Sequence, residues 1–269
     1  MVRLSFRRIA ALLLALCVPA LASGADPATE PAVTPAAVAT IVARLPHATN
    51  AFTEGLLIDR GKLYESTGYE RQSFITRYDL KTGKEERRVQ LAPDVFGEGI
   101  VVWRDEILNV IWHGGRGQRR SLRDFKLTGS FRYDGEGWAM TQDGHNIILS
   151  DGTPVLRFLD PKTMKVVRRL PVTLRGQPVQ RINELEYVNG SILANIWLTP
   201  VAVRIDPKTG VVTQLIDLSQ LVADAYPRDA DSVPNGIAYD AEHDRLYMTG
   251  KNWPWLYEVK LEPASATAP

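Results

Sequence analysis

The 269-residue sequence contains one cysteine and four histidines. Cys17 lies in an N-terminal segment that we expect to be removed on export, so the mature chain is predicted to have no cysteine and to be held by its core alone. The histidines His47, His113, His145 and His243 lack the spacing of metal ligands. We therefore predict no metal and no cofactor, and we assign these histidines no role.

Other common functional patterns are also absent. The sequence shows no Ser-His-Asp arrangement, P-loop or dinucleotide fingerprint. It has no excess of positive charge either, because loss of Arg3, Arg7 and Arg8 with the N-terminal segment lowers the formal net charge from +1 to −2. Nucleic acid is therefore not an expected partner.

The N-terminus has the organisation of a signal peptide. The basic residues Arg3, Arg7 and Arg8 precede the apolar run 9–18, and Ala20-Leu21-Ala22 has the small residues of a cleavage site. The run is shorter than the roughly 20 residues that span a bilayer. We predict cleavage after residue 22 and export to the periplasm or medium without stable membrane association. The general secretory route fits better than the twin-arginine route.

The remaining chain is predicted to form one domain. Residues 23–38 are rich in alanine and proline and are expected to be a flexible lead-in. Residues 39–262 are expected to form a single catalytic domain, and residues 263–269 a disordered tail.

Short strands separated by turns recur along this domain. The first unit has expected strands at 55–58, 62–66, 74–80 and 85–91. Equivalent openings follow at Gly99, Gly137, Leu185 and Gly236, at spacings of 44, 38, 48 and 51 residues. This is the length of a four-stranded propeller blade. We predict an all-β, five-bladed β-propeller whose last blade is closed by the N-terminal strand 40–45, and a monomer, since a closed ring needs no partner.

One stretch fits this repeat poorly. Where the second unit should have its third strand, the chain is glycine-rich and basic from Gly114 to Arg120. We interpret this stretch as a loop insertion with a short edge strand.

Unusual polar and aromatic residues lie at the blade openings or at the ends of second strands. Antiparallel connectivity places these positions at one mouth of the channel. Candidates there are Glu98, Trp112, Trp138, Asn183, Glu186, Trp197 and Lys251. Each has a structural alternative: core packing for the tryptophans, a solvated charge for Lys251 and Glu186, and a turn for Asn183. We expect Asp79, Asp151, Asp160 and Asp206 to fix turns.

Taken together, eight stretches resemble the plant and bacterial class of glutaminyl-peptide cyclotransferases. They occur in the family's order and spacing at residues 52–56, 96–100, 135–138, 150–153, 183–187, 194–197, 235–238 and 249–251. The resemblance runs from about Val38 to Leu261. It implies a five-bladed propeller, unrelated to the zinc-dependent animal enzymes, that converts N-terminal glutamine of peptides or proteins to pyroglutamate with release of ammonia.

The resemblance also implies roles for individual residues. Glu98 is expected to be a proton shuttle whose pKa is raised by burial against the tryptophans. Asn183 and Lys251 are expected to hold and polarise the γ-carbonyl group. The expected substrate-binding residues are Phe52, Glu54, Trp112, Trp138 and Trp197.

Two departures from the family pattern affect this assignment. Position 54 is Glu, where many relatives have Gln, so an ionic contact between Glu54 and the substrate amine is expected. The stretch from Gly114 to Arg120 replaces a regular strand and bears on the shape of the pocket beside Trp112.

The sequence is also compatible with two other functions. A non-catalytic, peptide-binding propeller would keep the tryptophans and would not need Glu98. A calcium-dependent, lactonase-like propeller would need carboxylates converging on a metal, and we predict full activity in chelator instead.

Overall fold

The computed structural model describes residues 34–264, which contain twenty-two strands and one short helix. The predicted signal peptide and most of the lead-in lie outside these residues. Among the described residues, no helix is long and apolar enough to cross a membrane.

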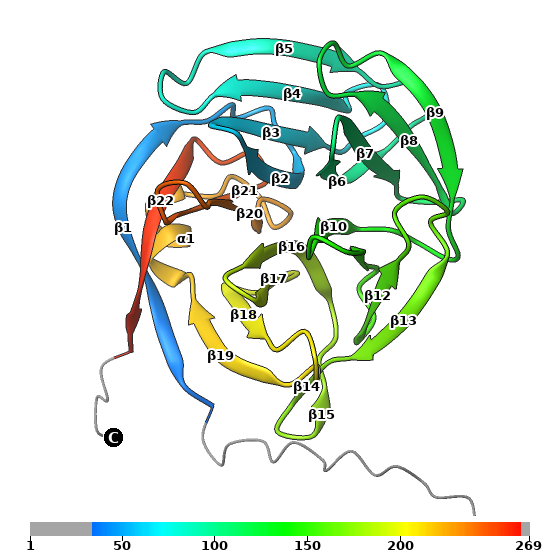
Figure 1. The fold of residues 1–269 in the computed structure, drawn as a ribbon. Helices are drawn as coiled ribbons and strands as arrows, with labels where there is room; N and C mark the ends of the chain where they lie inside the picture. Colours follow the sequence, from blue (N-terminus) through cyan, green and yellow to red (C-terminus); the bar gives the residue numbers. More distant parts are fainter. Residues whose placement is uncertain (1–33, 265–269) are drawn as a thin grey trace, which may run out of the picture.

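Twenty of the strands form five groups of four, and four of these groups have their strands in sequence order from the centre outward (Figure 1). The first contains β2 (Thr53–Asp59), β3 (Lys62–Thr67), β4 (Phe74–Asp79) and β5 (Glu85–Gln90). The second contains β6 (Gly97–Trp103), β7 (Glu106–Ile111), β8 (Arg116–Ser121) and β9 (Leu127–Arg132). The third contains β10 (Ala139–Gln142), β11 (Ile147–Ser150), β12 (Val155–Leu159) and β13 (Val166–Pro171). The fourth contains β16 (Ile182–Val188), β17 (Ser191–Ile196), β18 (Val201–Ile205) and β19 (Val212–Asp217).

The last group combines both ends of the described chain. It consists of β20 (Pro234–Asp240), β21 (Arg245–Gly250), β22 (Trp255–Pro263) and, outermost, β1 (Ala36–Pro46). β1 pairs antiparallel with β22 along most of its length, and its first three residues pair in parallel with β19. The predicted closure by the N-terminal strand is confirmed. The strand begins at Ala36, so residues 36–38 belong to it and not to the predicted lead-in.

The innermost strands close a ring. β2 contacts β6, β6 contacts β10, β10 contacts β16, β16 contacts β20, and β20 contacts β2. Inner strands such as β2 and β6 are almost wholly buried, whereas the outermost strand β5 is almost wholly exposed. This gradient explains the sequence pattern, because a strand covered on both faces is apolar throughout and a solvated outer strand is polar. The predicted all-β propeller is confirmed.

The core is divided among the interfaces between neighbouring sheets. Ile75 and Ile107 belong to the apolar cluster between the first and second sheets, and Leu108 and Ile147 to the next one. Comparable clusters join the third to the fourth sheet, the fourth to the last, and the last to the first. Every sheet is thus stabilised by two neighbours, which keeps the inner strands in fixed positions around the channel.

The interpretation of Gly114 to Arg120 as a loop insertion was wrong. Residues 116–121 form β8, an interior strand paired with both β7 and β9. Gly117 leaves room for the Phe131 ring, which a Cβ atom would approach to 2.1 Å. Arg119 binds Glu106 at 2.9 Å, and its guanidinium lies 5.6 Å from the centre of the Phe131 ring. Tertiary partners therefore satisfy a strand whose residues have low β-propensity.

Two further elements interrupt the repeat. The helix α1 (Ser219–Ala225) follows β19 and buries Leu221 and Ala225 in the core between the fourth and last sheets. A small hairpin of β14 (Thr173–Leu174) and β15 (Gln177–Pro178) lies between β13 and β16.

Candidate active site

Four of the five innermost strands are irregular at the same place, close to their first residue. The pairing register shifts between Thr53 and Gly55 in β2, and between Gly97 and Ile100 in β6. Equivalent shifts occur between residues 182 and 185 in β16 and between 234 and 237 in β20. Such bulges re-aim side chains near functional sites. Here they contain Glu54, Glu98, Asn183 and Asn235, the polar residues of the repeated blade openings.

Side chains of the second strands hold the backbone at these bulges. Ser66 donates to the carbonyl oxygen of Glu98 at 2.5 Å, and Asn109 donates to the same oxygen at 3.0 Å. Ser150 binds the carbonyl oxygen of Asn183 at 2.7 Å in the same way. The irregular backbone groups thus remain bonded, which fixes the direction of each functional side chain.

The bulges open onto a pocket of about 240 Å³ at one mouth of the channel. All eight predicted site residues line it: Phe52, Glu54, Glu98, Trp112, Trp138, Asn183, Trp197 and Lys251. Three further lining residues are Tyr69, Phe96 and Asp231. The volume lies below the roughly 300–1,000 Å³ of sites for drug-sized ligands. The pocket therefore suits one residue of a peptide rather than a longer segment.

Aromatic rings form the walls. Trp138 and Trp197 meet edge to face with ring centres 5.6 Å apart, and Phe96 packs against Trp112 at 5.2 Å. Gly152 is required behind this wall, because its φ is +77° and a Cβ atom would come within 2.4 Å of the Trp138 ring. The packing explains the glycine at this position of the motif at residues 150–153.

At the base of the pocket, Lys251 is paired with Glu54. Its Nζ atom lies 2.6 Å from Oε1 of Glu54 and 4.3 Å from the centre of the Phe52 ring. Asn235 donates to the other carboxylate oxygen of Glu54 at 3.2 Å. All of these polar side chains are buried. The structural alternative of a solvated charge for Lys251 is wrong, and the pairing of Glu54 with Lys251 was not predicted from the sequence.

Glu98 lies beside this pair, and its pKa is raised well above the usual value. Burial is the largest cause, the negative charge of Glu54 is the second, and the positive charge of Lys251 opposes both. A hydrogen bond between the two carboxyl groups further raises the pKa of Glu98, while burial raises that of Glu54 despite Lys251. The direction for Glu98 is the predicted one, but the part played by Glu54 was missed. The pKa values of both carboxyl groups are raised, so the pair binds a proton more tightly than an isolated glutamate does.

Asn183 has an unsatisfied side chain. Its Oδ1 atom is buried and has no hydrogen-bond partner among residues 34–264. Asn183 lines the pocket, and an unpaired buried carbonyl costs free energy, so the position of this amide is not explained by hydrogen bonds within the protein.

Two more carboxyl groups lie deeper in the channel. Glu184 accepts hydrogen bonds from the backbone N–H groups of Leu56 and Ile237, and so joins the first sheet to the last. Glu186, predicted to lie at the mouth or to face solvent, is instead buried, where it accepts bonds from Tyr239 N–H and Thr141. The bulge in β16 changes the alternation on which that prediction depended. Burial raises the pKa of Glu186 to about 8.

The four aspartates that were predicted to fix turns do so. Asp79, Asp160 and Asp206 each accept a backbone N–H bond within a turn. Asp151 does the same and also binds Arg157 at 3.1 Å.

The residues missed by sequence reasoning are on or beside the loops at the mouth. Phe96 begins the motif at residues 96–100, which was a usable signal. Tyr69 and Asp231 come from loops without a repeat equivalent, and no pattern marked them. In the described part of the chain, no three His, Cys, Asp or Glu side chains are arranged as a metal-binding group.

The fold and site together define a β-propeller with a buried carboxyl pair and an ammonium group in an aromatic pocket. The chain belongs to the glutamine cyclotransferase family, whose model matches residues 11–261. It is 39% identical over 231 residues to the glutaminyl-peptide cyclotransferase of Arabidopsis thaliana, covering 84% of this chain and 72% of that protein. It also resembles the crystal structure of Myxococcus xanthus glutaminyl cyclase, with 36% identity, a TM-score of 0.81, and coverage of 87% of this chain and all of that one.

Proposed function

We propose that the protein converts N-terminal glutaminyl residues of peptides or proteins to pyroglutamate and releases ammonia. Membership of the glutamine cyclotransferase family and the names of the two relatives support this activity. The observation that carries the proposal is the buried Glu98 beside Glu54 and Lys251, in a pocket sized for one residue. Neither the family nor the relatives support the non-catalytic, peptide-binding alternative.

The reaction is an intramolecular aminolysis. The α-amine attacks the γ-carboxamide carbon, a C–N bond forms, and the bond to the amide nitrogen breaks. One proton leaves the attacking nitrogen and one reaches the departing nitrogen, so ammonia is released without net proton uptake. The nucleophile is tethered to its target, so the site mainly holds the folded conformer and moves protons. An N-terminal amine with a pKa of about 7.7–8.0 is partly neutral near pH 7.

Glu98 is the proposed proton shuttle. Because burial and the negative charge of Glu54 raise its pKa, Glu98 binds a proton more tightly than a solvated glutamate, and it donates that proton to the departing nitrogen. It then takes the proton of the attacking nitrogen and returns to its starting state. Glu54, paired with Lys251, accepts the hydrogen bond of protonated Glu98 between turnovers.

Asn183 and Lys251 are the proposed groups for the γ-carboxamide. An ammonium has three N–H donors, and one of those of Lys251 is directed at Glu54. The others are available to the γ-carbonyl oxygen, which gains negative charge as the amine adds. The Asn183 side chain lines the same pocket, and its amide N–H group is the proposed further donor to that oxygen.

The aromatic walls are proposed to bind the substrate side chain and to exclude water. Phe52, Trp112, Trp138 and Trp197 are the proposed contacts for the aliphatic stem of the glutaminyl residue. Packing of these rings keeps water from the γ-carbonyl group and disfavours hydrolysis to glutamate, the competing reaction.

The test of this function is incubation of the purified protein with a Gln-initiated peptide. We expect ammonia release matched by a mass loss of one ammonia, and full activity in a chelator, since we propose metal-independent chemistry. Absence of turnover with every such peptide would contradict the proposal, and loss of activity in chelator would contradict the metal-free part of it.

The cellular setting is proposed on sequence grounds. We propose that residues 1–22 are removed on export to the periplasm or medium, that the chain from Ala36 to Pro263 forms the single catalytic domain, and that the protein is a monomer. Most of the predicted lead-in and tail lies outside the described residues. N-terminal sequencing of the exported protein and its mass in solution test these points.

A further inference from the structure

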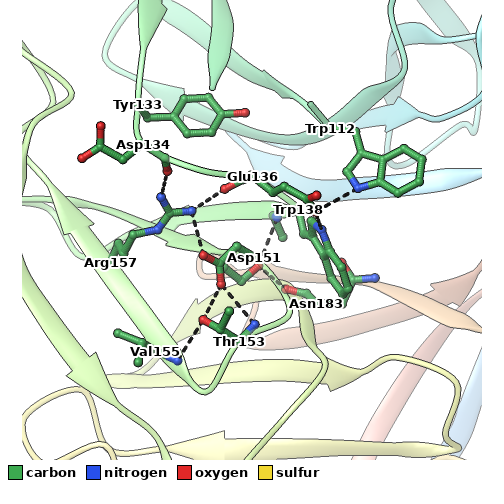
Figure 2. A network of polar contacts seen from close by, with 12 residues as sticks. Trp112, Tyr133, Asp134, Glu136, Trp138, Asp151, Thr153, Val155, Arg157 and Asn183 are labelled. Carbon is green, nitrogen blue, oxygen red and sulfur yellow. Dashed lines mark hydrogen bonds and ion pairs between the residues drawn. The ribbon is translucent and has the colours of Figure 1, made fainter. Parts of the chain in front are cut away.

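The carboxylate of Glu136 joins two walls of the pocket. The indole N–H groups of Trp112 and Trp138 donate to the same oxygen, Oε2, at 3.1 and 2.9 Å (Figure 2). Trp112 follows the second strand of the second sheet, whereas Trp138 precedes the first strand of the third sheet. Glu136 therefore joins side chains that belong to different sheets and have no shared backbone hydrogen bond.

The backbone around Glu136 is itself held firmly. The guanidinium of Arg157, which is buried, donates to the carbonyl oxygens of Asp134 and Glu136. It also binds the Asp151 carboxylate at 3.1 Å. Figure 2 shows this guanidinium between the Asp134–Glu136 loop and Asp151. The loop cannot move without breaking bonds to a buried cation. The backbone of Glu136 is therefore held in place, which limits the positions that its carboxylate can reach.

A third ring is attached to the same group. His113 stacks on Trp112 with ring centres 4.1 Å apart and planes at 21°. Its Nδ1 atom lies 3.3 Å from Oε1 of Glu136. Trp138 in turn contacts Trp197 edge to face. By holding Trp138, Glu136 therefore also affects where the Trp197 ring packs.

The side chain of Glu136 is about 42% exposed, and it is not among the residues that line the pocket. Glu136 could be solvated by water at this exposure, so burial does not force it to bond to the two indole groups. An indole N–H is a donor only, and one carboxylate oxygen can accept two such bonds. Hydrogen bonds to an ionised acceptor are also stronger than bonds between neutral groups.

We propose that Glu136 is a positioning residue that sets the spacing of Trp112 and Trp138 for the glutaminyl side chain. This inference rests on the proposed function of the same pocket. It assigns Glu136 no contact with the substrate and no part in proton transfer.

The charge of Glu136 has a second, weaker consequence. Glu54, Lys251 and Asp231 line the pocket with Glu98, and Glu136 lies behind its wall. The negative charge of Glu136 contributes to the raised pKa of Glu98. Neutralising Glu136 alone lowers the pKa of Glu98 and moves the high-pH limit of activity to lower pH. A purely structural residue would not move that limit.

Two substitutions separate these effects. Glu136→Leu removes both the charge and the acceptor for the indoles. Glu136→Gln removes the charge, but its single carbonyl oxygen can still accept both indole N–H bonds. Glu106→Gln is the matched control. The Glu106 side chain has a similar exposure of about 36% and also binds a basic side chain, that of Arg119. Glu106 begins β7, whereas Trp112 and the pocket lie at the other end of this strand.

For Glu136→Leu we expect KM for a Gln-initiated peptide to rise on the order of tenfold, the effect of losing hydrogen bonds to a charged group, with a smaller change in kcat. Tryptophan emission should become more accessible to acrylamide. Glu136→Gln should retain most of the affinity and shift the descending limb of the pH profile to lower pH. Glu106→Gln should change neither KM nor the pH profile.

An unchanged KM and unchanged quenching in Glu136→Leu would overturn the inference. So would equal effects in Glu136→Leu and Glu106→Gln. The quenching measurement needs no turnover, so it tests the inference separately from the proposed function: an inactive wild-type protein refutes the function, whereas unaltered quenching refutes the role of Glu136.

Discussion

The Nζ atom of Lys251 lies 2.6 Å from Oε1 of Glu54, and the two side chains are only 6% and 3% exposed. Residues almost two hundred positions apart in sequence thus form one buried ion pair at the base of the pocket. Removal of one partner leaves the other charge buried and unpaired, which is costly. The effect of Lys251 on turnover must therefore be separated by experiment from its effect on stability.

The first prediction concerns this pair. Lys251→Met alone should lower the free energy of unfolding by about 3–5 kcal/mol, the typical cost of breaking a buried ion pair. The double variant Lys251→Met with Glu54→Gln should recover much of this stability, because no unpaired charge remains, but it should not recover turnover. Denaturant unfolding and ammonia release measure the two effects. Recovery of turnover with stability would show that Lys251 has only a structural role.

The second prediction concerns Asn183. Asn183→Leu is close in size and removes a buried oxygen without a described partner, so thermal stability should be unchanged or higher. Turnover should fall on the order of 10²–10³-fold if the amide stabilises the carbonyl oxygen in the transition state. Calorimetry and steady-state kinetics check this combination. A loss of stability with near-normal kcat would contradict the assigned role.

The third prediction is a pH dependence of stability from Glu186. Its folded pKa of about 8 is above the ordinary value of about 4.3 in an unfolded chain, so the folded state binds the proton more tightly. The stability that this provides is fully present below about pH 4.3 and is lost as pH rises to 8. Glu186→Gln should therefore flatten the fall in Tm between pH 5 and 8, with each 1 kcal/mol appearing as about 2–4 °C. An identical fall in the wild type and the variant would contradict this assignment.

The fourth prediction concerns the glycines around Glu98. A Cβ atom at position 99 would lie 2.4 Å from Cα of Ala139 and 2.7 Å from N of Met140, both backbone atoms that cannot move aside. Gly99→Ala should therefore destabilise the protein by about 1–3 kcal/mol and lower turnover by shifting Glu98. Gly129→Ala is the control, since its nearest neighbour would be 4.0 Å away on a flexible arginine side chain. Equal stability of the two variants would contradict this close packing.

Much of the fold followed from the sequence, because its repeat is local. Strand and turn signals recur within each unit, and a strand without a unit at the N-terminus implies closure by β1. The location of the site at one mouth of the channel was predicted from strand connectivity, which places Glu98, Asn183 and Lys251 at the same end. Two elements did not follow. β8 has the composition of a loop and becomes a strand through contacts with Phe131 and Glu106, and α1 is a single short helix outside the repeat.

The detailed site could not be predicted for a different reason. The pairing of Glu54 with Lys251 and the role of Glu136 depend on side-chain directions set by bulges and by neighbouring sheets. A one-residue shift in β16 moved Glu186 from the expected mouth into the channel. Sequence patterns give the residue types at each opening, but the register fixes which of them meet.

The central claim is that Glu98 moves the proton between the attacking and departing nitrogens, and Glu98→Gln tests it most directly. Glutamine preserves size and the backbone bonds of Ser66 and Asn109, so circular dichroism and Tm should remain close to those of the wild type. Turnover of a Gln-initiated peptide should fall by about 10²–10⁴-fold, the usual contribution of a positioned acid or base. A folded Glu98→Gln variant with near wild-type turnover would contradict the account.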